Sequence, residues 1–343
     1  MEDKKQAILN IFMGILLLAI LVVAGVAVMS WRDKNTLSPE ENTEQTENSG
    51  VVEKWQEGDV SYQDKTYRYN NSIKTYLFLG TDNEGAMEET DSEWLGGQSD
   101  AIFLLVTNAK EKKMSVISVN RNTMTMVDIY DLLGNCVQQE EMQICLQYAY
   151  GDGGRSSCLR TVNTISRLFY NIPISGYFSM NMDGLPFLND VVGGVTVEVM
   201  DDLKNEKLGV SLKKGETVTL NGKEAYVYIR SRDVNEFDSA TRRLERQNQY
   251  LLSLFKRISE LGLAEEANVA RITNLMEDYM LTSIDFGRLA EDASEYVFDS
   301  SCMHNVPGKT VMGEIYEEYY VDEDALYELI LEVFYEEVSE DNP

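Results

Sequence analysis

The sequence predicts an α/β or α+β domain in which helices flank a central mixed β-sheet. Three short apolar runs end at glycine or polar residues and have the composition of central strands buried on both faces. After these runs come segments with apolar residues at spacings of three and four, which are typical of amphipathic helices. Because these strands and helices alternate along the chain, a sheet covered by helices is the expected architecture.

The predicted elements follow one another over the middle and end of the chain. The three apolar strands are residues 75–80, 101–107 and 114–119, and a polar turn at 108–113 joins the last two. Residues 191–199 predict a strand entered through a glycine bend, and residues 225–230 fit either a strand or the start of a helix. Amphipathic helices are predicted at residues 157–170, 243–261, 284–297 and 323–335.

Composition excludes several classes of protein. The chain of 343 residues has 30 Lys and Arg against 58 Asp and Glu, which gives a formal net charge of −28. Binding to nucleic acid normally requires a basic surface, so nucleic acid is not an expected partner. One histidine and four scattered cysteines leave little room for a His-based zinc site or a Ser-His-Asp triad. Phosphate or metal chemistry must therefore rest on Asp and Arg.

The N-terminal region predicts a membrane anchor. Residues 8–29 are apolar except for Asn10, and a helix of that length spans about 33 Å, close to the bilayer core of roughly 30 Å. We expect a retained single-pass anchor behind a cytoplasmic stub (1–7). A cleaved signal peptide, whose apolar region is only about 7–15 residues long, is the alternative. The polar, acidic residues 30–66 predict a disordered linker, followed outside the membrane by a folded domain (67–261) and a helical extension packed on it (262–343).

Charged residues stand at the predicted strand ends. Asp82 follows the first strand, Asp100 precedes the second and Arg121 follows the third. Five arginines, interrupted by Asp233 and Asp238, then fall within seventeen residues: Arg230, Arg232, Arg242, Arg243 and Arg246. Arginine can fork two phosphate oxygens, and carboxylates together with phosphate oxygens can hold Mg²⁺. The pattern predicts a diphosphate clamp with a metal; the alternative is a surface helix of ion pairs.

The order of several short motifs resembles the LytR-CpsA-Psr family, also called cell envelope-related transcriptional attenuators. The resemblance covers roughly residues 74–261 and includes a V-G-G-V-x-V strand and an R-x-x-R-Q segment. The matching segments are 80–82 (GTD), 99–100 (SD), 121–123 (RNT), 149–154 (AYGDGG), 192–197 (VGGVTV), 220–222 (LNG), 228–232 (YIRSR), Asp238 and 243–247 (RLERQ).

This resemblance implies a cell-envelope ligase. Such enzymes transfer an anionic glycopolymer, of teichoic acid or polysaccharide type, from a polyprenyl-diphosphate carrier to the C6 hydroxyl of N-acetylmuramic acid in peptidoglycan. It also implies catalytic roles for Arg121, Asp100 and Asp238, and Mg²⁺ as a cofactor bound by Asp82 and Asp100. The residues that it assigns to diphosphate binding are Arg121, Arg230, Arg232, Arg243, Arg246 and Gln247.

The sequence departs from the family pattern beside Arg121, where it lacks a proline and an aspartate. The family usually has Pro-Arg-Asp-Thr where this chain has Asn120, Arg121, Asn122 and Thr123. The aspartate's negative charge is therefore missing beside the expected clamp. Two alternatives to a transferase follow: a non-catalytic protein that binds polyprenyl phosphate and acts in the envelope or its regulation, and a polyprenyl-diphosphate hydrolase that uses water as the acceptor.

For the four cysteines and the single histidine we expect structural roles or positions at the surface. Cysteines outside the membrane can form disulfides, and a disulfide among the first three is one alternative; buried free thiols are the other. His304 has no partner in any motif, so we expect a structural or surface role for it. The four cysteines are Cys136, Cys145, Cys158 and Cys302.

Overall fold

The computed structural model describes residues 58–83, 85, 87, 97–233, 235–261, 276–285, 298 and 300–338. The expected stub, anchor and linker up to residue 57 lie outside the described residues, as does most of the helix expected at 284–297. No helix in the part of the chain described here is long and apolar enough to cross a membrane.

A six-stranded mixed sheet forms the centre of the fold, as the sequence predicts. Its strand order is β13-β8-β3-β4-β5-β14; β8 runs parallel to β3 and β14 parallel to β5, while the other pairs are antiparallel. The strands are β3 (Ile73–Thr81), β4 (Ser99–Asn108), β5 (Lys113–Val119), β8 (Gly176–Asn181), β13 (Met280–Thr282) and β14 (Met303–Asn305).

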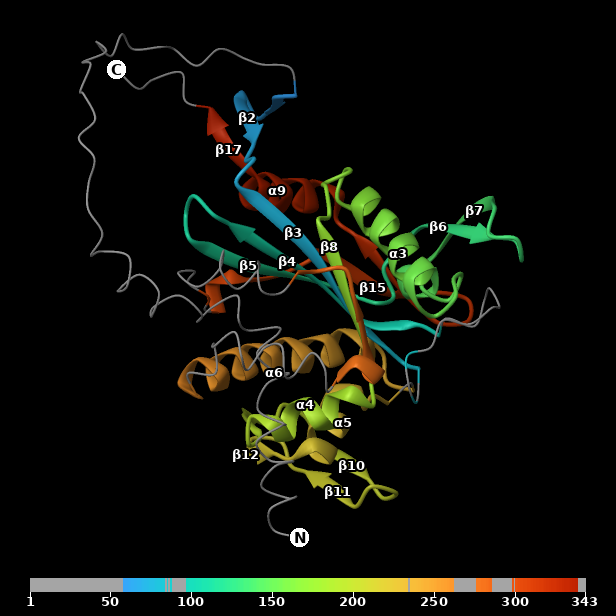
Figure 1. Ribbon diagram of the computed structural model, residues 1–343, viewed down its shortest axis with the longest axis vertical. Coiled ribbons are helices and arrows are strands. Elements are labelled where there is room, and N and C mark those ends of the chain that lie inside the picture. Colours follow the sequence, from blue (N-terminus) through green and yellow to red (C-terminus); the bar gives the residue numbers. More distant parts are fainter. Residues whose placement is uncertain are drawn as a thin grey trace, which may run out of the picture.

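Helices cover both faces of this sheet, which gives three layers (Figure 1). Helices α3 and α9 lie on one side, and α4, α5 and α6 lie on the other. On β4, Ile102 and Leu104 join the core under α3 and α9, whereas Leu105 joins the opposite core. Both faces of the central strands are therefore buried, which explains their continuous apolar sequences. The helices are α3 (Arg155–Leu168), α4 (Gly184–Val191), α5 (Gly222–Arg230), α6 (Ser239–Leu261) and α9 (Glu323–Phe334).

Residues 225–230, which the apolar pattern left undecided, are helical. Asn221 caps α5 by accepting hydrogen bonds from the backbone nitrogens of Lys223 (3.0 Å) and Glu224 (3.1 Å). In return, Glu224 accepts a hydrogen bond of 2.9 Å from the backbone nitrogen of Asn221. This reciprocal capping box selects the helix. The strand expected at 191–199 is shorter than predicted, because α4 extends to Val191 and a two-glycine turn precedes β9 (Val195–Glu198).

Smaller sheets and hairpins surround the central layers. They comprise β1–β2–β17, β6–β7, β9–β12, β10–β11 and β15–β16. Their bounds are β1 (Val60–Tyr62), β2 (Lys65–Tyr69), β6 (Met124–Tyr130), β7 (Cys136–Gln143), β10 (Leu203–Asn205), β11 (Val210–Leu212), β12 (Thr217–Leu220), β15 (Gly308–Met312), β16 (Glu317–Val321) and β17 (Tyr335–Val338); short 3₁₀ turns lie at η3 (Ile144–Gln147), η4 (Glu277–Tyr279) and η5 (Ser300–Cys302).

Two expected boundaries need correction. The linker does not extend to residue 66, because β1 and β2 already belong to a sheet completed by β17 from the other end of the chain. The polar strand β2 is held in the sheet by its pairing with β17 rather than by apolar side chains of its own. The described part of residues 262–343 is not mainly helical either. Apart from α9 it consists mostly of strands, two of which form the edges of the central sheet.

Candidate active site

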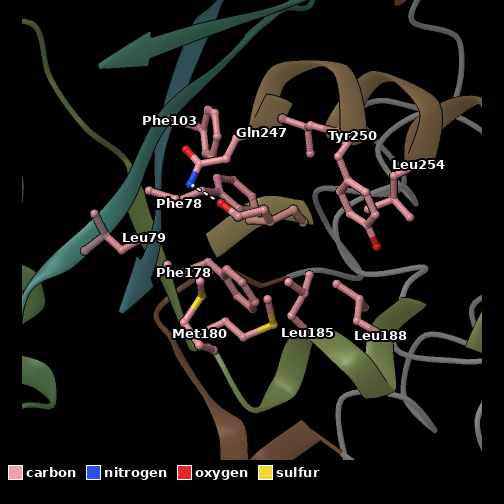
Figure 2. Close-up of a pocket in the computed structure, with 15 residues that line it drawn as sticks. Phe78, Leu79, Phe103, Phe178, Met180, Leu185, Leu188, Gln247, Tyr250 and Leu254 are labelled. Carbon is pink, nitrogen blue, oxygen red and sulfur yellow. Dashed lines mark hydrogen bonds between the residues drawn. The ribbon is translucent and has the colours of Figure 1, made fainter. Parts of the chain in front are cut away.

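An apolar pocket lies between the central sheet and helices α4, α5 and α6. Its volume is about 130 Å³. Phe78, Phe103 and Phe178 enter it from three neighbouring strands, and leucines of α4 and α6 close the other side (Figure 2). Small residues form one wall of the pocket where Gly80 pairs with Ala101. A Cβ atom on Gly80 would lie only 3.1 Å from the Ala101 Cβ. The sequence alone could not distinguish this pocket from an ordinary core.

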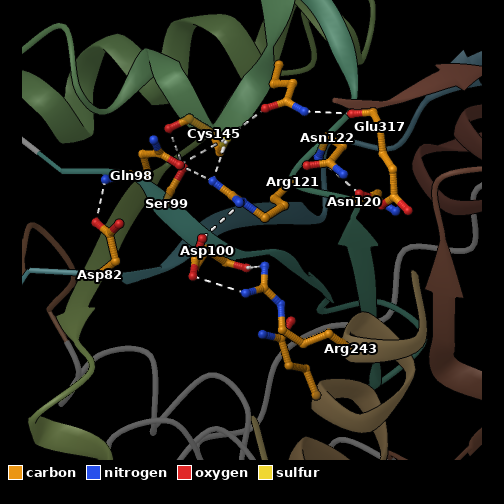
Figure 3. A network of polar contacts seen from close by, with 12 residues as sticks. Asp82, Gln98, Ser99, Asp100, Asn120, Arg121, Asn122, Cys145, Arg243 and Glu317 are labelled. Carbon is orange, nitrogen blue, oxygen red and sulfur yellow. Dashed lines mark hydrogen bonds and ion pairs between the residues drawn. The ribbon is translucent and has the colours of Figure 1, made fainter. Parts of the chain in front are cut away.

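A buried ion-pair network lies beside the pocket, and Asp100 is at its centre (Figure 3). Asp100 Oδ1 is 3.0 Å from Arg121 Nε, and Asp100 Oδ2 is 3.1 Å from Arg243 Nη1. The three side chains are 4–11% exposed. They meet because β4 and β5 are antiparallel neighbours: Asp100 lies at the start of β4 and Arg121 just after the end of β5. Burial lowers the pKa of Arg243 to about 10, although the charge of Asp100 opposes this change.

The other side of Arg121 contacts Gln98 and Cys145. Arg121 Nη2 donates to Gln98 Oε1 and lies 3.1 Å from Cys145 Sγ. Burial raises the pKa of the Cys145 thiol. Gln98 also donates its backbone nitrogen to Asp82 Oδ1 at 2.6 Å, which places the Asp82 carboxylate at the same edge of the sheet. The structure thus brings together Arg121, Asp100, Arg243 and Asp82.

Arg232 differs from these arginines because no hydrogen bond or ion pair to another described residue holds its guanidinium. Burial, and next the positive charge of Arg121, lower the pKa of Arg232. Its side chain lines a polar cavity of about 590 Å³ between the start of α6 and the β10 region. The carboxylates Asp201, Asp202, Asp233 and Glu236 line the same cavity, but none of them forms an ion pair with Arg232 in the described structure. A half-buried guanidinium that has no ion pair and lies near a second guanidinium can bind an anion.

Like Arg121 and Arg243, three further predicted diphosphate-binding residues contact other groups of the protein. Arg246 donates to the carbonyl oxygens of Tyr228 (3.0 Å) and Ser231 and forms an ion pair with Asp201. These contacts fix the end of α5 against α6. Gln247 donates to the Ile229 carbonyl at 3.4 Å and lines the apolar pocket (Figure 2). Arg230 donates to the Tyr226 hydroxyl, and its guanidinium lies 5.3 Å from the centre of the Tyr226 ring.

Asp238 occupies a separate cluster. It has a positive φ of 61° just before α6, and its carboxylate accepts a hydrogen bond from the Thr310 hydroxyl. Its backbone nitrogen donates to Glu317 Oε1 at 2.5 Å. Sequence reasoning did not identify Glu317, because it reaches the site through the β15–β16 hairpin from a distant part of the chain.

Magnesium fits this site only in part. Both oxygens of Asp100 already face guanidinium groups, so a divalent cation bound there would lie beside two positive charges. Asp82 has no such ion pair among the described residues and is the better ligand. Within those residues no group of three or more His, Cys, Asp or Glu side chains could hold a metal. Mg²⁺ commonly uses only one or two carboxylates with phosphate oxygens and water, and that arrangement fits Asp82.

The four cysteines form no disulfide. Cys145, Cys158 and Cys302 are buried and Cys136 is exposed. His304 lies on β14 at the edge of the central sheet, half buried, and burial lowers its pKa. The structural or surface role expected for His304 stays a prediction.

Comparison with known proteins identifies the family. The LytR_cpsA_psr family matches residues 32–332. The chain belongs to this family. TagU of Enterococcus faecalis, a polyisoprenyl-teichoic acid–peptidoglycan teichoic acid transferase, is 27% identical over 297 residues, which cover 86% of this chain and 84% of that protein.

Other relatives agree over shorter stretches. TagV of Bacillus subtilis, a transferase of the same description, is 29% identical over 206 residues, and the match covers 59% of this chain but only 46% of that protein. The crystal structure of protein gbs0355 from Streptococcus agalactiae has a TM-score of 0.61 at 20% identity and covers 76% of this chain and 86% of that one. This likeness confirms the mixed α/β fold.

Replacing Arg246 with alanine is expected to lower the free energy of unfolding by about 3 kcal/mol, because it leaves buried carbonyl oxygens without a donor and Asp201 without its ion pair. Denaturant unfolding measures this change. The matched control is Arg242→Ala, whose ion pair with Glu236 is at the surface, with an expected change within about 0.5 kcal/mol. Unchanged stability with a selective loss of lipid-diphosphate binding would show instead that Arg246 binds the ligand.

Proposed function

We propose that the protein is a transferase that moves an anionic glycopolymer, of teichoic acid or polysaccharide type, from a polyprenyl-diphosphate carrier to peptidoglycan. In this proposal the acceptor is the C6 hydroxyl of N-acetylmuramic acid. The products are a polymer joined by a phosphodiester and polyprenyl phosphate. Membership of the LytR_cpsA_psr family and the names of the TagU and TagV relatives support the class of reaction.

The observation that carries this proposal is that an apolar pocket and a buried guanidinium network share neighbouring residues of β3 and β4. Ala101 lines the pocket, and the preceding residue, Asp100, holds Arg121 and Arg243. Gly80 also lines it, two residues before Asp82. A ligand with a prenyl chain and a diphosphate would place its apolar part in the pocket and its charge at the arginines. The pocket would remove apolar surface from water, which stabilises binding by roughly 25 cal/mol per Å².

In this arrangement Arg232 and Arg121 bind and neutralise the diphosphate. Arg243 acts through Asp100, because it shares that carboxylate with Arg121 and fixes its position. Transfer of a phosphoryl group depends chiefly on positioning and on the neutralisation of charge as the bond to the leaving oxygen breaks. Fixed guanidinium groups at the leaving phosphate would supply both.

Asp82 is the residue that would hold Mg²⁺ in this proposal, with phosphate oxygens and water as the other ligands. When bound, the ion would add charge neutralisation at the diphosphate. We also propose that residues 8–29 anchor the protein in the cell membrane as a single pass, with the folded domain outside. This location would bring the pocket to carriers held in the bilayer.

Release of polyprenyl phosphate tests the proposed reaction. The full chain, in detergent with Mg²⁺, is incubated with a prenyl-diphosphate-linked glycan, with and without peptidoglycan oligomers. We expect release that requires the oligomers. Release at the same rate without them would indicate a hydrolase, and tight binding of the donor without release would indicate a non-catalytic binding protein.

Filling the pocket tests the binding of the prenyl chain. Leu251→Trp places a larger side chain in the pocket wall on α6. We expect the KM for a long-chain donor to rise at least about tenfold, equivalent to about 1.4 kcal/mol, while a short-chain donor is less affected. The control is Leu159→Trp, at an exposed position of α3 on the other side of the sheet. Equal effects on both donors would contradict this use of the pocket.

A further inference from the structure

Glu317 brings a carboxylate from the C-terminal part of the chain to the active site. It is the first residue of β16, whose backbone is attached to the site segment at two points. The backbone nitrogen of Tyr319 donates to the Asn122 carbonyl at 2.9 Å, and Gln143 Nε2 donates to the Glu317 carbonyl at 2.7 Å. Figure 3 shows Glu317 beside Asn122 in the same polar network. The position of Glu317 is therefore fixed by backbone contacts and does not depend on its own side chain.

The two oxygens of this carboxylate have different surroundings. Oε1 accepts the hydrogen bond from the Asp238 backbone nitrogen at 2.5 Å, which orients the group. Oε2 is buried and has no hydrogen-bond partner among the described residues. A buried carboxylate oxygen without a donor is costly, so a site that keeps one is expected to receive a hydrogen bond from something it binds.

The other polar groups of the site are less suited to accept a proton. Both oxygens of Asp100 face guanidinium groups, and Asp238 Oδ1 already accepts from a hydroxyl. Position 122 carries an amide, which cannot take a proton at neutral pH. Within the described residues, Glu317 is the carboxylate that presents a buried oxygen with no partner.

Charged groups surround Glu317. Burial and the charge of Arg121 lower the pKa of Arg232, in the segment after α5, and the negative charges of Asp100 and Glu317 oppose this change. Asp238 faces Glu317 from the segment before α6. On the same strand, Glu318 accepts a hydrogen bond of 2.9 Å from the Tyr320 hydroxyl and is engaged there. Glu317 therefore belongs to the same group of charges as the guanidinium proposed to bind phosphate.

We propose that Glu317 is the general base of the transfer reaction, an inference that rests on the function proposed above. Oε2 accepts the proton of the acceptor hydroxyl while the hydroxyl oxygen forms a bond to the phosphorus that carries the glycan. The bond from that phosphorus to the bridging oxygen breaks, and its electron pair leaves with polyprenyl phosphate. The proton is later released from Glu317 to solvent. The carboxylate of β16 thereby supplies the basic group that the amide of Asn122 cannot.

Glu317→Gln tests this role, because it keeps the shape of the side chain and removes its basicity. In the full chain with Mg²⁺, prenyl-diphosphate-linked glycan and peptidoglycan oligomers, we expect kcat to fall about 10²–10⁴-fold. The KM for the donor should stay within about threefold, because the diphosphate contacts remain. The neighbouring Glu318→Gln is the matched control and should transfer at the wild-type rate. Glu317→Asp keeps a carboxylate one methylene further back and should retain more activity than Glu317→Gln.

The pH profile separates a base from a structural residue. A protonated glutamate cannot accept a proton, so the wild-type kcat should fall as the pH decreases, and the residual rate of Glu317→Gln should lack this decrease. Wild-type kcat in Glu317→Gln, a change in KM alone, or an unchanged pH profile would overturn the role of Glu317 while leaving the proposed function intact. Absence of transfer by the wild-type chain itself would overturn both.

Discussion

Replacing Arg121 with alanine is expected to lower kcat for glycopolymer transfer by at least about 10³-fold. Arg121 is buried beside Asp100, and we propose that it neutralises charge on the diphosphate as polyprenyl phosphate leaves. Removing an arginine that stabilises the transition state of phosphoryl transfer costs about 10³–10⁵-fold. The fold should persist, because Asp100 keeps its ion pair with Arg243. Single-turnover kinetics with the lipid-linked donor measure the effect.

Two further variants sharpen this test. Arg121→Lys keeps the positive charge but loses the planar fork, so most of the loss should remain. Lys110→Ala removes a cation from an exposed ion pair with Glu336 and should leave transfer unchanged. A residual rate in Arg121→Ala within about tenfold of the wild-type rate would contradict the proposed role of Arg121, since charge stabilisation of this kind is worth far more.

Replacing Asp100 with asparagine should have the largest effect on stability. Asp100 alone supplies the carboxylate that Arg121 and Arg243 share in the described structure, and both side chains are nearly buried. Removing one partner of a buried ion pair costs about 3–5 kcal/mol, because the remaining charge is uncompensated. We expect the thermal midpoint to fall by about 6–10 °C. Transfer measured below that midpoint should also be nearly lost, because Arg121 is no longer fixed.

The control for this variant is Glu206→Gln, which removes a carboxylate from an exposed ion pair with Lys204. Such pairs contribute about 0–1 kcal/mol, so its midpoint should hardly change. If Asp100→Asn were as stable as the wild-type protein, the ion pairs of Asp100 would not be structural. The proposed fixing of Arg121 by Arg243 through Asp100 would then be wrong.

The central strands could be predicted from the sequence because both of their faces are buried, which leaves a continuous apolar signal. The edge strands β13 and β14 could not, because three residues each carry no such pattern. Strand β2 owes its pairing to β17, from the far end of the chain. Local sequence carries no information on that contact. The capping box at Asn221 was a signal that could have decided the helical state of α5.

Some residues of the candidate site could likewise be predicted from the sequence, and others could not. The positions of Asp100 and Arg121 at strand ends were enough to predict that they lie together. The separate roles of Arg243 and Arg246 were not predictable, because both are buried arginines one turn apart on α6. Only their partners, Asp100 and Asp201, distinguish them. Glu317 lay beyond sequence reasoning because the fold of the β15–β16 hairpin alone brings it to Asp238.

The chemistry of the product tests the central claim most directly. Peptidoglycan oligomers recovered after incubation with the full chain and lipid-linked glycan can be digested and analysed by mass spectrometry and ³¹P NMR. We predict a phosphodiester between the glycan and the C6 oxygen of muramic acid, formed by the wild-type chain and absent with Arg121→Ala. Free glycan phosphate with unmodified muramic acid, formed whether or not oligomers are present, would contradict the account.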